Sequence, residues 1–174
     1  GGLAGPLQTP VFRNVQQLFV HEKELAFWRD ETISAGAPDA FKPFFEVARN
    51  AFSAYDDKLV PFREEAILPG IQTVPLFGHT PGHTGYLLGD EKESLLIWGD
   101  IVHFPHIQVA QPDVTIAFDS DPAAAAAIRS KVLDRAASDN LAVSGMHFNL
   151  PTTGKVIREG NSFALNYDLW SPAV

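Results

Sequence analysis

Hydrophobic residues at helical spacing dominate the first third of the chain. Segment 40–55, AFKPFFEVARNAFSAY, repeats apolar side chains three and four residues apart and predicts an amphipathic helix with an aromatic face. Its Pro43 suits the first helical turn, where a missing N–H costs little. The pattern over 21–31 predicts a second helix, and the pattern over 15–20 predicts a short strand. The cluster of Ser, Gly, Pro and Asp residues over 34–39 predicts a turn.

The pattern changes after residue 66, where short runs typical of β-strands alternate with turn residues. Strands are predicted over 71–77, 84–90, 95–98 and 141–143, and a hairpin over 155–167 that turns at Glu159-Gly160-Asn161. Between them, 121–140 predicts a long helix with Asp121 as its cap and Pro122 at its first position. The mixture of helices and strands predicts an α/β (α+β) layered fold.

Composition and charge exclude several classes of function. The 174 residues are 45% hydrophobic, as in a globular chain with a core, and no window reaches the run of apolar residues that a membrane helix needs. A net charge of −8 without a Lys/Arg cluster argues against a nucleic-acid partner. The chain has no Cys, so any metal site must use His, Asp and Glu. No signal peptide is visible, but Gly1 does not resemble a native start, so a cytoplasmic or periplasmic location stays open.

Three predicted strands each lead into a residue that is able to bind a metal. His79 follows the strand 71–77, Asp100 follows 95–98, and His147 follows 141–143. Strand ends that meet at one edge of a sheet are common places for sites in layered α/β proteins, and two imidazoles with one carboxylate suit Zn²⁺, Mn²⁺ or Fe²⁺. On spacing alone an alternative stays open, in which His79 and His83 cap strand-end carbonyls and Asp100 caps a turn.

Three motifs in order carry a resemblance to a known family. GHTPGHT, LLIWGDIVH and SGMHFNLPTTGKV resemble the metallo-β-lactamase superfamily, and are most similar to its branch of lactonases and methyl-parathion-hydrolase-like organophosphate hydrolases. PDVTIAFDSDPAAAAAIRSKVLDRAA and FALNYDLW extend the similarity over nearly the whole chain. The resemblance implies an αβ/βα sandwich and a metal-dependent hydrolase.

The resemblance also implies a role for each of the three residues. His79 would bind a first metal, His147 a second, and Asp100 would bridge the two as a ligand and catalytic residue. The cofactors implied are two divalent ions, zinc first, with Mn or Fe as alternatives. A hydroxide held between them would attack a small ester, lactone or phosphotriester.

Further His and Phe residues lie close to these motifs. We expect His83 to stiffen the turn by a hydrogen bond behind the ligands, or to bond only to backbone, and His103 to lie in the pocket near the metals. Phe104 and Phe148 are candidates to line an apolar substrate cleft, although aromatic residues more often belong to a core. We expect His106 to be an ordinary loop residue, and His21 to cap a helix or to lie at the surface.

The H-x-H-x-D-H motif of the resembled family is absent from the printed sequence. We therefore expect residues 1–174 to form one incomplete domain, in which 1–65 is a linking and helical segment and 66–174 holds the second sheet and its helices. The segment with the motif is expected in a separate chain, outside this sequence or lost, and the aromatic helix 40–55 is expected to be a lid or a contact with a second copy. Two alternatives stay open: a mononuclear iron oxygenase similar to persulfide dioxygenases, and a non-catalytic fragment. The chain alone is expected to be inactive.

Overall fold

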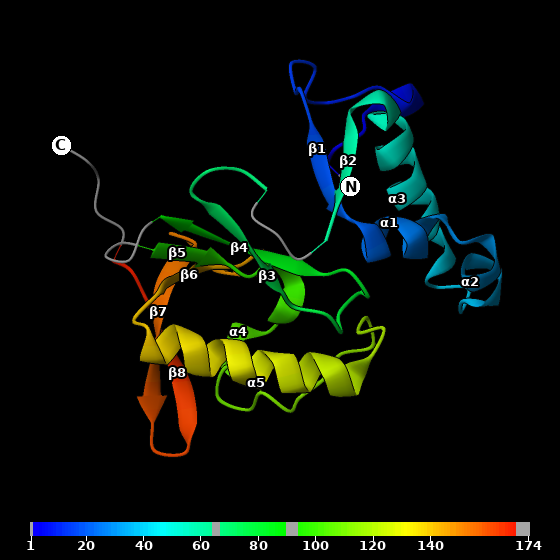
Figure 1. Ribbon diagram of the computed structural model, residues 1–174. Helices are drawn as coiled ribbons and strands as arrows, with labels where there is room; N and C mark the ends of the chain where they lie inside the picture. Colours follow the sequence, from blue (N-terminus) through cyan, green and yellow to red (C-terminus); the bar gives the residue numbers. More distant parts are fainter. Residues whose placement is uncertain (1, 64–66, 90–93, 170–174) are drawn as a thin grey trace. The chain divides into compact units, whose positions relative to one another are not determined.

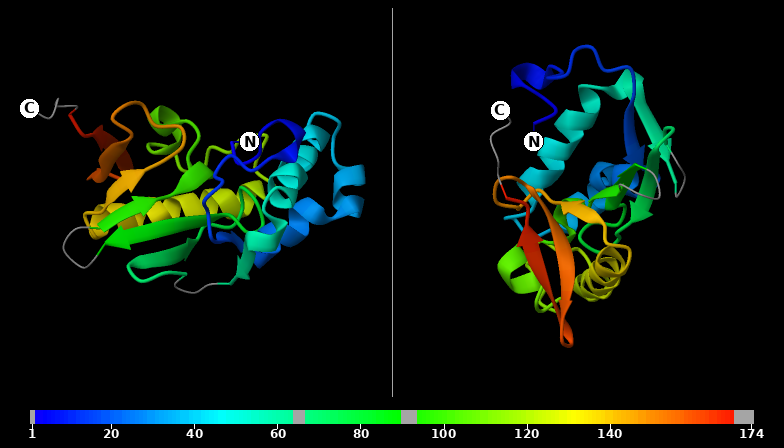
Figure 2. Two further views of the ribbon diagram at one scale, coloured as in Figure 1. Left: turned by 90° about the horizontal axis from the view of Figure 1, so that it is seen from above. Right: turned by 90° about the vertical axis from the view of Figure 1, so that its left-hand side faces the viewer.

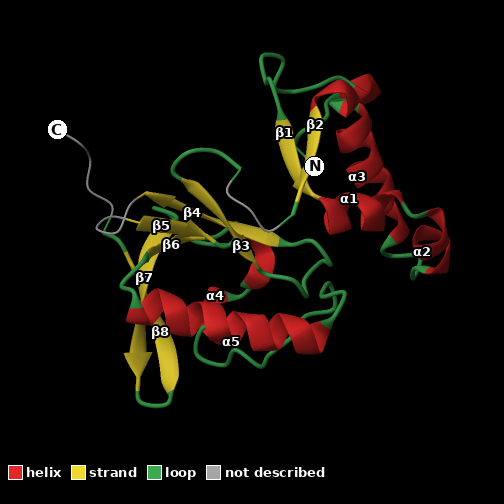
Figure 3. Cartoon of the chain, in the orientation of Figure 1, coloured by secondary structure: helices red, strands yellow, loops and turns green. Residues whose placement is uncertain are grey.

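The chain divides into two units, Gly1–Arg63 and Glu64–Val174. The computed structural model describes residues 2–63, 67–89 and 94–169. The first unit is mainly helical, and the second consists largely of strands with one long helix (Figure 3). Within those ranges, no helix combines the length and the apolar character that crossing a bilayer requires.

The first unit packs three helices with a short parallel ribbon. Its elements are the 3₁₀ turns η1 (Pro6–Gln8) and η2 (Asp56–Lys58), the helices α1 (Glu22–Arg29), α2 (Glu31–Gly36) and α3 (Lys42–Ser53), and the strands β1 (Leu18–His21) and β2 (Leu59–Phe62). Strand β1 pairs in parallel with β2. The structure confirms the helix predicted over 40–55, with Pro43 in its first turn, and His21 as the cap of α1.

One local prediction in this unit was wrong. The turn expected over 34–39 begins only after Gly36, because α2 covers Glu31–Gly36. Asp30 ends α1 and its carboxylate accepts hydrogen bonds from the N–H groups of Thr32 and Ile33, at 2.7 and 2.9 Å. This cap supplies partners for the free donors at the start of a helix and so begins α2 directly after α1.

Aromatic packing holds the first unit together. Phe45 is 3% exposed, and its ring centroid lies 5.3 Å from that of Phe27 and 4.8 Å from that of Trp28. The Tyr55 hydroxyl accepts a hydrogen bond from the Phe12 N–H and donates one to the Leu3 carbonyl, which attaches the N-terminal segment to the end of α3. Only part of the aromatic face predicted for α3 is buried, since Phe44 is 45% exposed.

The second unit is a six-stranded sheet whose strands follow one another in chain order. The strands are β3 (Ile71–Pro75), β4 (Thr84–Gly89), β5 (Ser94–Ile97), β6 (Ala142–Ser144), β7 (Thr153–Glu159) and β8 (Ser162–Tyr167). All neighbours are antiparallel except β5 and β6, which are parallel. The connection from β5 to β6 contains η3 (Gly99–Ile101), α4 (Pro105–Gln108) and α5 (Pro122–Ser138).

Helix α5 lies along one face of this sheet (Figures 1 and 2). Val132, Leu133 and Ala136 of the helix form one core with Leu96 and Val143 of the sheet, and all five are at most 4% exposed. The Asp121 carboxylate accepts from the Ala124 N–H at 3.0 Å and Pro122 begins the helix, as predicted. The predicted hairpin is also confirmed as β7 and β8.

The pairing directions bring three strand ends to one edge of the sheet. Strand β4 is antiparallel to both β3 and β5, so β3 and β5 run in the same direction. Strand β6 is parallel to β5 and therefore shares that direction. The segments that leave β3, β5 and β6 consequently start at the same edge, and they carry His79, Asp100 and His147.

Candidate metal centre

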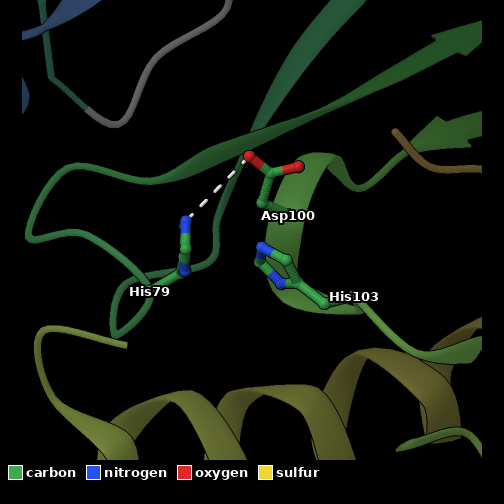
Figure 4. A group of neighbouring side chains, drawn as sticks. All are labelled: His79, Asp100 and His103. Atoms are coloured by element: carbon green, nitrogen blue, oxygen red, sulfur yellow. Dashed lines mark ion pairs between the residues drawn. The ribbon is translucent and has the colours of Figure 1, made fainter. Parts of the chain in front are cut away.

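Asp100 lies at the centre of a cluster of ligand-capable side chains. His79, Asp100 and His103 each offer one ligand atom, and these atoms all lie within 4.8 Å of one another. His79 Nε2 is 3.9 Å from Asp100 Oδ2. His79 comes from the turn after β3, and Asp100 and His103 come from the segment that begins with η3 (Figure 4).

His147 approaches Asp100 from the segment that follows β6. Its Nε2 lies 3.4 Å from Asp100 Oδ1, and its side chain is 42% exposed. The His147 ring stacks on that of His103, with 4.3 Å between the ring centroids. The three residues predicted from the strand ends are thus neighbours, and His103 lies among them. Their roles as ligands stay a prediction.

Two polar atoms of the cluster are buried without a hydrogen-bond partner in the described structure, His103 Nδ1 and Asp100 Oδ1. Burial, and then the nearby His79 and His147, lower the pKa of His103 to about 4, so its imidazole is neutral at pH 7. A neutral imidazole and a carboxylate with free lone pairs are the donors that a divalent cation takes. The residues present therefore fit a metal ion.

His83 lies behind the cluster and bonds to backbone on both sides. Its Nδ1 is 3.1 Å from the Leu76 carbonyl, and its Nε2 accepts the Asp100 N–H at 3.0 Å. The first contact requires a proton on Nδ1 and the second a lone pair on Nε2, so a neutral ring satisfies both. Burial lowers the pKa of His83 to about 4. The ring thus connects the end of β3 to Asp100 and has no free nitrogen for a metal.

Gly99 allows this close approach of His83. Its φ is +57°, and a Cβ at this position would lie 2.7 Å from His83 Nε2. Both the backbone conformation and the lack of space exclude a larger side chain. The glycine of the Gly99-Asp100 step therefore lets the imidazole reach the Asp100 N–H.

Two residues that the sequence reasoning missed support His79, namely Asp119 and Arg129. Asp119 Oδ1 lies 3.1 Å from His79 Nδ1, and its Oδ2 lies 3.5 Å from Arg129 Nη2, with both side chains fully buried. A carboxylate on Nδ1 favours the tautomer that leaves the Nε2 lone pair free toward Asp100. One signal was available: Arg129 falls on the apolar face of α5, and a buried Arg requires a partner.

Arg129 and Gln108 also hold the segment that connects β5 to α5. Arg129 donates to the Ile101 carbonyl at 2.6 Å and to those of Pro112 and Val114 at 2.7 and 2.8 Å. Gln108, which is fully buried, accepts the N–H groups of His103 and Phe104 and donates to the Val114 carbonyl. These bonds fix the backbone on both sides of His103.

The start of α5 packs directly on the turn that carries His79. Gly78 has φ +137°, and a Cβ there would lie 2.3 Å from the Ala125 nitrogen. The Ser120 and Asp121 N–H groups donate to the carbonyls of His79 and Gly78, both at 2.9 Å. Glycine at 78 therefore allows the helix start to hold His79 in place.

The predicted aromatic residues lie in different surroundings. Phe104 is 49% exposed next to His103, whereas the Phe148 ring packs edge-on against Trp98 at 5.3 Å and Tyr167 at 5.4 Å. His106 lies on α4 outside the cluster, and its ring is 6.3 Å from that of Phe104.

Solved structures share this fold. The chain superposes on the hydrolase AbOPH of the β-lactamase superfamily (TM-score 0.88, 24% identity, 98% of this chain and 60% of that one). It also superposes on AidC, a dizinc quorum-quenching lactonase in complex with the product N-hexanoyl-L-homoserine (TM-score 0.87, 22% identity, 98% of this chain and 60% of that one). A probable metal-dependent hydrolase from Staphylococcus aureus matches with a TM-score of 0.72 at 20% identity, over 97% of this chain and 58% of that one. No protein-family model and no curated protein matches the sequence.

The chain therefore has the metallo-β-lactamase fold of these structures, as the sequence motifs predicted. The chain spans about 60% of the length of the first two structures. Because the three structures are only 20–24% identical to this chain, the similarity shows the fold and not the activity.

Proposed function

We propose that the chain is part of a metal-dependent hydrolase that cleaves a small ester, lactone or phosphotriester. The observation that carries the proposal is the convergence of His79, Asp100, His103 and His147 at one sheet edge. Among the described residues, the buried Asp100 Oδ1 and His103 Nδ1 have no hydrogen-bond partner. The hydrolase folds to which the chain is similar support the same class of reaction.

The residues of this chain have distinct parts in the proposal. His79, Asp100 and His147 hold divalent ions, with Asp100 between the two imidazoles, and zinc is the first candidate. Asp119 accepts a hydrogen bond from His79 Nδ1 and so favours the tautomer with the proton on that nitrogen. His83 accepts the Asp100 N–H and holds the Asp100 backbone in position. When bound, the cations lower the pKa of water and polarise the bond to be hydrolysed.

This chain supplies part of the ligand set that two ions need. A structural or catalytic zinc site takes three or four protein ligands per ion, and the cluster offers four residues within the part of the chain that the structure describes. We therefore assign full activity to the gene product that contains residues 1–174 together with an H-x-H-x-D-H segment. The isolated chain should bind metal weakly and hydrolyse none of these substrates.

A second candidate function has its own observation. His79, His103 and Asp100 form a set of two His and one carboxylate, which is the ligand set of non-haem iron oxygenases. The mononuclear iron oxygenase therefore stays the alternative, and metal analysis separates the two. One iron per chain and consumption of O₂ would favour it, whereas two zinc ions per chain would favour the hydrolase.

The test compares Asp100→Ala with Asp134→Ala in the gene product that contains this chain. Asp134 lies on α5 in a surface ion pair with Arg158, so its replacement controls for the loss of a carboxylate. Metal content and calorimetric zinc titration should show at least a tenfold loss of affinity for Asp100→Ala alone. Hydrolysis of a lactone, a p-nitrophenyl ester and a phosphotriester is measured in parallel. Unchanged metal content in Asp100→Ala, or hydrolysis that survives a chelator, would contradict the proposal.

A further inference from the structure

We propose that His103 is a third protein ligand of the metal ion that His79 and Asp100 hold. The inference rests on the proposed function, because it concerns the metal centre of the same site. It adds a ligand to the three residues that the family resemblance implies. The ligand atoms of His79, Asp100 and His103 all lie within 4.8 Å of one another. Figure 4 shows the rings of His79 and His103 turned toward Asp100.

The three ligand atoms are close enough to share one ion. Nitrogen and oxygen ligands bind zinc at about 2.0–2.2 Å, so two ligands of one ion lie at most about 4.4 Å apart. His79 Nε2 and Asp100 Oδ2 already satisfy this limit at 3.9 Å. The His79 and His103 rings are 4.8 Å apart between centroids and inclined at 51°, so they face the space between them from different directions. A shift of about 1 Å in the His103 ring would complete the set.

A buried side chain fixes the backbone of His103. Oε1 of Gln108, which is fully buried, accepts the N–H groups of His103 and Phe104 at 2.7 and 3.0 Å. The amide of the same Gln108 donates to the Val114 carbonyl at 2.9 Å. Hydrogen bonds behind the ligands are typical of metal sites, because they hold each ligand in position before the ion arrives. His103 therefore has the kind of support that Asp119 gives to His79.

His147 has no comparable support. Its side chain is 42% exposed, and its described contacts are the approach to Asp100 at 3.4 Å and the stacking on His103. Among the described residues, no buried side chain holds His147 in the way that Gln108 holds His103. We therefore assign His103 to the ion at His79, and His147 to a second ion whose further ligands come from the H-x-H-x-D-H segment.

The ring of His103 also differs from that of a structural histidine. His83 uses both of its ring nitrogens for hydrogen bonds to backbone groups. His103 Nδ1, in contrast, is buried and has no hydrogen-bond partner in the described structure. A buried polar group without a partner costs stability unless a further group binds there. The ring of His103 thus has binding capacity that the described protein does not use.

The experiment detects the ligands directly and does not depend on hydrolysis. The gene product that contains this chain is labelled with ¹⁵N-histidine, stripped of metal and saturated with ¹¹³Cd²⁺. The cadmium spin splits the NMR signal of any nitrogen that is bound to the ion. We expect a split ring-nitrogen signal for His103 as well as for His79. His106, an exposed residue on α4 outside the cluster, should show no splitting.

Two matched variants assign the signals and measure the contribution to affinity. His103→Gln should remove one split signal and weaken zinc binding at least about tenfold, whereas His106→Gln should change neither. An unsplit His103 signal beside a split His79 signal, or equal zinc affinities of the two variants, would overturn the inference and leave the proposed metal centre standing. Splitting at His103 in a gene product that hydrolyses none of the proposed substrates would instead refute the proposed function and leave this ligand standing. Absence of splitting at every histidine would refute both.

Discussion

Replacing Asp119 by Asn tests the support of the candidate metal centre. The substitution keeps the shape of the side chain and removes its charge. Its carboxylate accepts from His79 Nδ1 at 3.1 Å and from the Ile116 N–H at 3.2 Å, and it faces Arg129 Nη2 at 3.5 Å, all in a fully buried position. Asn would therefore leave the Arg129 guanidinium buried without an opposite charge.

The expected loss of stability follows from these contacts. Removing one partner of a buried ion pair costs about 3–5 kcal/mol. Arg129 keeps its bonds to three carbonyls, so we expect the lower end, about 3 kcal/mol in the free energy of unfolding. An Asn amide also no longer favours the His79 tautomer as strongly, and zinc affinity should fall by about 10–100-fold.

Urea unfolding followed by circular dichroism gives the stability, and zinc titration gives the affinity. Asp134→Asn is the matched control, because its ion pair with Arg158 is about half exposed and should be worth less than about 1 kcal/mol. Arg129→Met and the double variant complete a cycle, in which we expect a coupling energy of about 1–3 kcal/mol. If Asp119→Asn costs no more than Asp134→Asn, the support assigned to Asp119 is refuted.

Three further predictions concern the same unit. With a chelator present, the free energy of unfolding should fall as the pH drops from about 6.5 to about 4, because the unfolded chain binds protons on His83 and His103 that the folded chain does not. His83→Gln should remove the part due to His83, roughly 3 kcal/mol, and an unchanged pH profile in this variant would contradict the prediction. Gly99→Ala should destabilise by at least about 1 kcal/mol more than Gly160→Ala, which shares a positive φ but has open space around it; equal urea midpoints would disprove the contact with His83. Leu133→Ala should cost about 2–5 kcal/mol in urea unfolding, because this side chain is fully buried in the core.

Local features of the fold were predictable from the sequence because they depend on neighbouring residues. Asp121 and Pro122 begin α5, Pro43 lies in the first turn of α3, and Glu159-Gly160-Asn161 makes the hairpin turn, each through contacts within a few positions. The family resemblance was likewise visible, since it rests on short motifs in a fixed order. The cap at Asp30 was also local but was overlooked, because Gly36 at the end of α2 and Pro38 after it suggested a turn.

Only the tertiary structure decided which side chains meet at Asp100 and what supports them. The alternation of strand directions from β3 to β6 brings segments about 20 to 70 residues apart to one sheet edge, and no local pattern specifies those directions. His83 and His79 stand four positions apart in the same motif, yet one bonds to backbone on both sides and the other faces Asp100. The difference arises because Asp119, 40 residues away, accepts a hydrogen bond from Nδ1 of His79 and so leaves its Nε2 free to face Asp100. Such pairings depend on packing between distant segments, and the sequence by itself shows only the residues that are available for them.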